Sequence, residues 1–373
     1  MLTLESEFKE YDRIIRPSDT LRRAARDAHL DVRQRLNADK ELSPIIVADF
    51  LQGSYARHTM NDPSDLADVD TIVVTRLHEQ QWQPDDVLSK FAGWLANQYG
   101  EKRVSKNGRS INLELDDVEV DLVPTSAPSE AVMLNMRSYG EQIIAKAIQP
   151  GPEDDLLDAD EVFGPSITSI GDGTWAREPL RIPDLHAQQW QDTHPLATLE
   201  FTRNKNRECD KMFLRVVRAI KWWRKRVSGG PDHPKSYPVE HMVGDACRGG
   251  TFDSVAIGVT LALEEMQRTF RPYYVSRGKP KLRPRGLEHK FDADVLALLT
   301  STDFCGFYEQ LEIAAANARF ALNCSTPHDA GKAWQKVLGD EFPVPPPSKG
   351  GPSGGGFTPR TSSASQPTGG RFG

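Results

Sequence analysis

The first forty residues of the chain carry the spacing of an amphipathic helix. Apolar side chains recur there every three or four positions, at Phe8, Tyr11, Ile14, Ile15, Leu21, Ala25, Ala28 and Val32. Pro17 interrupts the pattern because proline lacks the amide that a helix interior needs, and Ser18 and Asp19 favour a new helix start because such side chains cap free amides. The pattern predicts a helix over residues 5–38 that is kinked or restarted at Pro17.

Two short apolar runs follow, Ile45–Leu51 and Val69–Thr75. Both are rich in the branched side chains that favour strands, and both lack alternating polar positions, so they are typical of strands buried on both faces. The first run ends at Gly53 and Ser54. Residues 84–99 have the periodicity of an amphipathic helix. The chain therefore begins with a helix and then adds strands and a further helix.

The clearest local pattern is a β-hairpin over residues 111–123. Apolar and polar residues alternate on both sides of Asp116 and Asp117, which fit a two-residue loop. With that loop, Leu113 faces Val120 on the apolar side. The other side is polar and carries Asn112, Glu114, Glu119 and Asp121. Asp121 is therefore expected to point away from the core.

Strand patterns are concentrated in the first half of the chain and helical patterns in the second. Between residues 126 and 198 the sequence is rich in Pro, Gly and acids, and we expect a solvated loop at the acidic run 153–161. Helical spacing is found at 205–227, 239–247, 253–270, 292–300 and 305–322. This order predicts an α+β domain over 1–200 and a helical domain over 201–342. Residues 343–373 form a tail rich in Gly, Pro and Ser that we expect to be disordered.

Composition narrows the class of protein. The 46 basic and 53 acidic residues give a net charge of -7, which argues against a protein that coats nucleic acid. No apolar stretch approaches the roughly 18 to 20 residues that cross a bilayer, and the charged N-terminus does not resemble a signal peptide. We therefore expect a cytoplasmic protein. Its four cysteines are too sparse for a disulfide framework, and His241 with Cys247 lacks the further ligands of a zinc site.

Candidate chemistry is concentrated in residues 50–74. A strand that runs into Gly53 and Ser54 and then into a helix start presents free amides that suit a phosphate. Asp68 and Asp70 lie two positions apart in a predicted strand, so both side chains project from one face. Neighbouring carboxylates repel each other unless cations lie between them, which favours Mg²⁺. With Asp121 as a third acid, the set describes a two-metal site for phosphoryl or nucleotidyl transfer.

This order of motifs resembles the nucleotidyltransferase superfamily of polymerase-beta type. Segments in the second half of the chain narrow this resemblance to the bacterial CD-NTases, enzymes similar to cyclic GMP-AMP synthase. The likeness spans about residues 10–330. The segments that carry this likeness are Ile182-Pro-Asp with Trp190, the helix around Lys221 in RAIKWWRKR, and the run from Lys235 to Glu240 that contains Lys-Ser-Tyr. The resemblance implies a mixed sheet flanked by helices, a C-terminal helical lobe, and an active site in the cleft between them.

The resemblance also assigns roles to residues. It implies that Asp68, Asp70 and Asp121 hold two Mg²⁺ ions, with Mn²⁺ as an alternative, and that these acids are catalytic. The nucleotide would be bound by Gln52, Gly53, Ser54, Lys221, Ser236 and Tyr237. In this arrangement the Gly-Ser turn, Lys221 and Ser236 contact the phosphates and Tyr237 stacks on a base. Asp121 is the acid expected to help deprotonate the attacking hydroxyl.

Three functions are compatible with this sequence. The first is a synthase that joins ATP, alone or with GTP, into a cyclic di- or trinucleotide for antiphage (CBASS) signalling. The second is a template-independent transferase that adds nucleotides to RNA or to a protein, with basic residues between Arg271 and Lys290 as its RNA-facing surface. The third is a catalytically silent sensor that only binds nucleotide. The presence of all three acids favours an enzyme.

The tail suggests a further partner. It contains Lys349, Arg360 and Arg371 but no acid, and it ends in Arg371, Phe372 and Gly373. A C-terminal glycine is open to adenylation and thioester transfer, as in ubiquitin-like proteins, and some CD-NTases are joined to other molecules in this way. We therefore expect a conjugating partner at Gly373, and we expect synthesis itself to need no tail.

Overall fold

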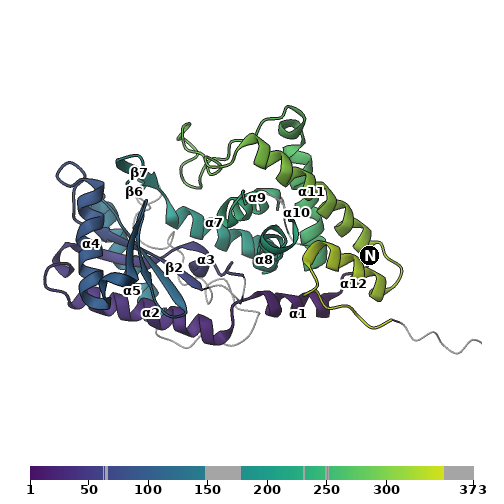
Figure 1. Cartoon of the computed structure of the whole chain (residues 1–373), viewed down its shortest axis with the longest axis horizontal. Helices are drawn as coiled ribbons and strands as arrows, with labels where there is room; N and C mark the ends of the chain where they lie inside the picture. Colours follow the sequence, from purple (N-terminus) through teal and green to yellow (C-terminus); the bar gives the residue numbers. More distant parts are fainter. Residues whose placement is uncertain are drawn as a thin grey trace, which may run out of the picture.

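The architecture joins a five-stranded sheet with its covering helices to a separate group of helices (Figure 1). It is a computed structural model that describes residues 1–61, 63, 66–147, 178–229, 232–247, 250 and 252–347. The acidic run 153–161 and residues 348–373 of the predicted tail, including Gly373, lie outside the described residues. In the described part of the chain, no helix combines the length and apolar character that crossing a bilayer requires.

The sheet is mixed and has the order β1-β2-β5-β4-β3. Its strands are β1 (Ile46–Leu51), β2 (Ala67–Thr75), β3 (Val104–Asn107), β4 (Ser110–Glu114) and β5 (Val118–Pro124). Strands β2 and β5 are parallel, and the other neighbouring pairs are antiparallel. The predicted hairpin is confirmed as β4 and β5, with Leu113 opposite Val120 and Asn112 opposite Asp121.

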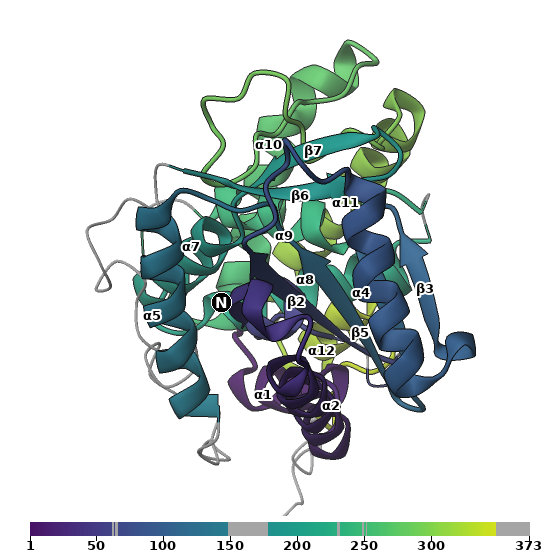
Figure 2. The same cartoon turned by 90° about the vertical axis from the view of Figure 1, so that its left-hand side faces the viewer.

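Helices cover both faces of this sheet (Figure 2). Helices α2 (Asp19–Ala38) and α4 (Pro84–Tyr99) bury their apolar side chains on the face that carries Val69 and Val73. Helix α5 (Glu130–Ala147) packs Val132 and Met136 on the opposite face, beside Ile72. A two-stranded sheet of β6 (Leu180–Asp184) and β7 (Gln189–Thr193) and the start of α7 (Pro195–Glu208) complete this part of the fold.

The second apolar core is helical. It is built from α8 (Phe213–Trp222), the π-helical turn Trp223–Val227, α9 (Ser236–Ala246), α10 (Val255–Val275), α11 (Ser301–Leu322) and α12 (Pro327–Leu338). The N-terminal helix α1 (Glu5–Ile15) also belongs to it, since Phe8, Tyr11 and Ile15 are buried among these helices. Phe342, after α12, is fully buried there and its ring meets that of Phe8 edge-on.

The break at Pro17 is therefore a boundary between two cores. Helix α1 ends at Ile15, and α2 begins at Asp19 with the Ser18 side chain accepting a hydrogen bond from the Leu21 amide. The restart predicted from the sequence is confirmed. Because α1 packs on helices and α2 packs on the sheet, the first forty residues link both parts of the molecule.

Several predicted elements are wrong. The helix expected over 205–227 is broken after Glu208 and restarts at Phe213. Residues 292–300 form turns and irregular chain instead of a helix, because the Asp294 side chain accepts hydrogen bonds from the Leu296 and Leu282 amides and so favours a turn. Within 126–198, where no regular structure was expected, the described residues include α5, β6, β7 and the start of α7. Helix α12 was not predicted.

Candidate active site

Three carboxylates meet on adjacent parallel strands. Asp68 and Asp70 project from β2 on the face that also carries Ile72, and Asp70 lies directly opposite Asp121 of β5 in the parallel register. Each of the three acids offers an oxygen atom, and these atoms lie within 4.8 Å of one another. The i, i+2 spacing and the polar side of the hairpin therefore converge as predicted from the sequence.

The electrostatics of this cluster favour a bound cation. Burial, followed by repulsion from Asp70 and Asp121, raises the pKa of Asp68 to about 7. Burial and repulsion from Asp121 raise the pKa of Asp70 to about 6, against the opposing effect of the Arg57 guanidinium. Carboxylate oxygens are hard ligands that suit Mg²⁺ or Mn²⁺, and positive charge removes the repulsion. The residues present therefore fit a divalent metal centre, in which Asp68, Asp70 and Asp121 would be the ligands.

The Gly-Ser turn lies directly against this cluster. Gly53 has a φ of +72°, and a Cβ atom placed on it would lie 1.7 Å from Oδ2 of Asp70. The Gln52 amide donates a hydrogen bond of 2.9 Å to the Asp70 carbonyl. Only glycine allows both the backbone conformation and the close approach. The predicted helix start is the single turn α3 (Gly53–Ala56), which lies between the sheet and the helices (Figure 1).

Lys221 is buried in the helical part, 3% exposed. Its Nζ donates a hydrogen bond of 2.7 Å to the Thr59 carbonyl and lies 3.8 Å from Glu240. Burial lowers the pKa of Lys221 to about 8, while the Glu240 carboxylate acts in the opposite direction. The lysine therefore contacts the segment that follows the Gly-Ser turn.

Tyr237 and Ser236 begin helix α9. The Tyr237 ring is half-buried, and the Arg57 guanidinium lies 5.3 Å from its centroid. Ser236 is exposed at the first residue of the helix. Arg57 therefore connects the aromatic ring expected to hold a base with the acids expected to hold metal, because it also acts electrostatically on Asp70.

Three residues at this site were missed by sequence reasoning. Glu240 is 4% exposed and accepts hydrogen bonds from Arg57, at 2.6 and 3.3 Å, and from the Thr59 hydroxyl, at 2.8 Å. Arg57 and Thr59 stand in the run Gly-Ser-Tyr-Ala-Arg-His-Thr, and Glu240 ends the run Lys-Ser-Tyr-Pro-Val-Glu. Both runs were recognised as motifs, but nothing in a single sequence shows that their charged ends pair across 183 positions.

Among the residues that the structure describes, His241 and Cys247 are not joined by the further ligands that a zinc site requires. The His241 ring contacts the Arg283 carbonyl and the Asp245 carboxylate. Within the described residues, the three aspartates form the one cluster of at least three His, Cys, Asp or Glu side chains close enough to share an ion.

Known proteins resemble this chain in sequence and in fold. Residues 2–135 match the Second Messenger Oligonucleotide or Dinucleotide Synthetase domain. A probable cyclic AMP-AMP-GMP nucleotide synthase from Salmonella paratyphi B is 36% identical, and a cyclic AMP-AMP-GMP synthase from Enterobacter hormaechei subsp. hoffmannii is 34% identical. Each match covers all of both sequences.

Solved structures share the fold at lower identity. CdnC of E. coli MS115-1, solved with ATP, has a TM-score of 0.62 and 15% identity, over 92% of this chain and 99% of that one. The CD-NTase CdnG of Bradyrhizobium diazoefficiens, solved with GTP, has a TM-score of 0.63 and 12% identity, over 90% of this chain and 95% of that one. The present chain combines this fold with full-length relatives and with a cluster of acids at a Gly-Ser turn. It therefore belongs to the bacterial CD-NTases, a family of nucleotidyltransferase enzymes.

Proposed function

We propose that this enzyme joins ATP and GTP into a cyclic trinucleotide with two adenosines and one guanosine, and releases pyrophosphate. The observation that carries this proposal is the full-length similarity to two cyclic AMP-AMP-GMP synthases. A cyclic AMP-AMP-AMP synthase from Acinetobacter is 28% identical over 92% of this chain, which also favours a three-membered ring. A role in antiphage signalling and a cytoplasmic location remain expectations from the sequence.

In each step, a ribose hydroxyl attacks the α-phosphorus of a bound nucleotide. A new oxygen–phosphorus bond forms, the bond to the bridging oxygen of the β-phosphate breaks, and pyrophosphate leaves. Three such steps close a trinucleotide ring. Two divalent ions held by Asp68, Asp70 and Asp121 would supply charge neutralisation at the phosphates.

The protein's own residues would bind the phosphates, take up the proton and hold the base. We propose that the turn of Gln52, Gly53 and Ser54 holds the phosphates beside the acids, and that Asp121 takes the proton of the attacking hydroxyl. Tyr237 would stack on a base, an interaction worth about 1–3 kcal/mol. Ser236 and Lys221 remain proposed phosphate ligands. Lys221 must then reach the phosphates from its position against Thr59 and Glu240.

The test is product analysis of the full chain. The enzyme is incubated with Mg²⁺ and with ATP, GTP or both, and phosphatase-resistant products are identified by mass spectrometry. A cyclic product with two AMP and one GMP units supports the proposal. Linear products, or incorporation only onto added RNA or protein, would favour a template-independent transferase. Nucleotide binding without any product would favour a silent sensor.

Conjugation of the tail remains a separate proposal. Its residues lie outside those the structure describes, so it rests on the sequence of Arg371, Phe372 and Gly373. Covalent adducts are compared for the full chain and for a chain without these three residues, in cells that contain the neighbouring genes. Adducts that need the three residues support the proposal, whereas equal adducts with both chains, or none, would count against it.

A further inference from the structure

The segment that follows the Gly-Ser turn is bound to the helical part of the molecule. Glu240 of α9 holds it from one side, through its bidentate pair with Arg57 and the hydroxyl of Thr59. Lys221 of α8 donates to the Thr59 carbonyl at 2.7 Å. Helices α8 and α9 of the helical core therefore bind Arg57 and Thr59, which lie between strands β1 and β2 in the sequence.

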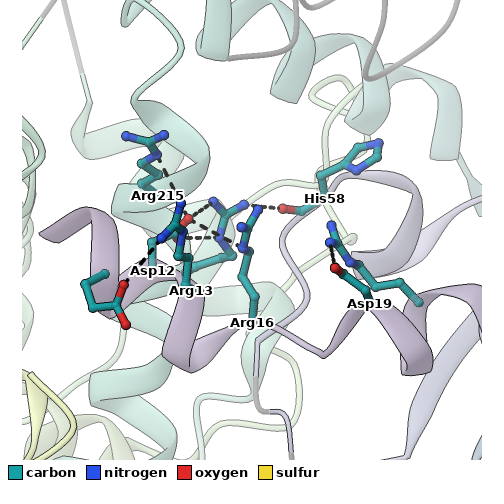
Figure 3. A network of polar contacts seen from close by, with 9 residues as sticks. Asp12, Arg13, Arg16, Asp19, His58 and Arg215 are labelled. Atoms are coloured by element: carbon teal, nitrogen blue, oxygen red, sulfur yellow. Dashed lines mark hydrogen bonds and ion pairs between the residues drawn. The ribbon is translucent and has the colours of Figure 1, made fainter. Parts of the chain in front are cut away.

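Arg218 of α8 holds the same segment from a second direction. Its Nη1 donates a hydrogen bond of 2.7 Å to the His58 carbonyl, and its own carbonyl accepts one of 3.3 Å from the Asn61 side chain. The guanidinium is fixed by Asp12 of α1, with distances of 2.8 and 2.9 Å. Figure 3 shows Asp12 beside Arg16 and Arg215, with the His58 carbonyl facing this cluster. Arg218 therefore links α1 to segment 57–61.

The segment in turn holds the Gly-Ser turn. The Thr59 amide donates a hydrogen bond of 2.9 Å to the Ser54 carbonyl, and the Arg57 amide donates one of 3.2 Å to the Gly53 carbonyl. Gly53 lies against the Asp70 carboxylate. A continuous path of hydrogen bonds and close contact therefore runs from the Glu240 carboxylate through Thr59 and Ser54 to an acid of the active site.

The chemistry of this path indicates a role beyond stability. Arg57, Glu240 and Lys221 are 7%, 4% and 3% exposed. Burying charges is costly, and buried ion pairs often stabilise a fold no better than apolar side chains of similar volume. What such a pair does supply is one defined geometry. Here that geometry fixes a turn whose backbone touches the reacting centre.

We propose that Glu240 and Arg218 are positioning residues for the nucleotidyl transfer. They hold segment 57–61, and through the Thr59–Ser54 hydrogen bond they set the phosphate-binding turn against Asp70. The turn is then aligned only while the helical core is docked on segment 57–61. This inference rests on the proposed function, since it assigns the phosphate site to the Gly-Ser turn.

Thr59 gives the sharpest test, because Thr59→Val keeps the shape of the side chain and removes only its hydrogen bond to Glu240. We expect kcat to fall about ten- to a hundredfold, since a misplacement near 1 Å costs about a hundredfold in rate. KM should change less than kcat, and the melting temperature should change by no more than a few degrees. Thr59→Ser, which retains the hydroxyl, should restore most of the rate. Glu240→Gln should have a larger effect on kcat.

Asp49→Asn is the matched control. Asp49 pairs with Arg33 at 3.0 Å, and both side chains are about as buried as those of Arg57 and Glu240. This pair joins α2 to β1 on the face of the sheet opposite Asp68 and Asp70, because Asp49 lies opposite Val73 in the register. Its loss should lower the melting temperature and leave kcat within about twofold, as for residues that share no partners. Wild-type kcat in Thr59→Val, or a loss of kcat in Asp49→Asn equal to that in Thr59→Val, would overturn the proposal.

A second measurement separates this inference from the proposed function. Hydrogen exchange of residues 50–60 is followed in the wild-type chain and in Thr59→Val, with and without Mg²⁺ and a nonhydrolysable ATP analogue. Faster exchange of the Gly-Ser turn in the variant supports the positioning role, even if no cyclic product is found. Unchanged exchange in the variant would count against it, whatever product the wild-type enzyme makes.

Discussion

Substituting Gly53 by alanine perturbs the active site at one atom. The residue has a φ of +72°, where an L-amino acid costs about 1–2 kcal/mol more than glycine. The added Cβ would also lie 1.7 Å from Oδ2 and 2.7 Å from Cγ of Asp70, closer than atoms can approach. Asp70 must therefore leave its rotamer, at about 0.5–1.5 kcal/mol, or the turn must move away from it.

The expected cost in stability is therefore about 1.5–3.5 kcal/mol, and a loss of activity is expected as well. Moving Asp70 or the turn by about 1 Å would disturb both the proposed metal ligand and the proposed phosphate site, so we expect kcat to fall at least about a hundredfold. Initial rates of pyrophosphate release at saturating nucleotide and Mg²⁺ measure this loss, and urea denaturation measures the loss of stability.

Gly100→Ala separates backbone strain from the clash. Gly100 has a φ of +95°, and a Cβ atom there would meet no other atom within 4 Å. It lies directly after α4, whereas the three acids lie on β2 and β5. The control should lose stability and keep its specific activity. The reasoning would be refuted by a Gly53→Ala enzyme with near wild-type kcat, or by a Gly100→Ala enzyme that loses as much activity as Gly53→Ala.

Other changes test the acids, the lysine, the metal and the tail. Asp68→Asn with Asp70→Asn should abolish turnover in rate assays and raise the metal-free melting temperature, because repulsion between carboxylates is removed; undiminished product would exclude the metal assignment. Chelation with EDTA should stop synthesis, and added Mg²⁺ or Mn²⁺ should restore it, whereas full activity in excess chelator would contradict a metal centre. The pKa of Lys221 is lowered to about 8 in the folded chain, against about 10.4 in the unfolded chain. The free energy of unfolding should therefore fall as the pH drops from about 10.4 towards 8. Urea denaturation at pH 8 and pH 10 should show this difference in the wild type and a smaller one in Lys221→Met; an equal difference in both would refute it. Removing Arg371–Gly373 should leave the rate of synthesis unchanged, and a slower truncated enzyme would contradict a dispensable tail.

Parts of this fold could be predicted from the sequence because they depend on interactions between residues that are close together in the chain. The hairpin was predictable because strict alternation and a two-residue loop fix its register without help from the rest of the fold. The side-chain period of a strand placed Asp68 and Asp70 on one face, and Pro17 with Ser18 marked the helix boundary. Other elements were not predicted correctly, because the local sequence pattern was short or misleading. Helix α7 begins with His194 as its capping residue, a type with little capping preference.

The tertiary structure alone decided how the two halves of the active site meet. The sequence determined the acids, the glycine at the turn and the presence of a charged helical half. It could not predict that Glu240 binds Arg57, or that Arg218 binds both Asp12 and the His58 carbonyl. The members of these pairs are 160 to 206 positions apart in the sequence. From the sequence alone, many other charged residues would be equally suitable partners for each of these side chains. Which pair forms depends on the packing of the helical core against the sheet, and that packing is a property of the whole chain.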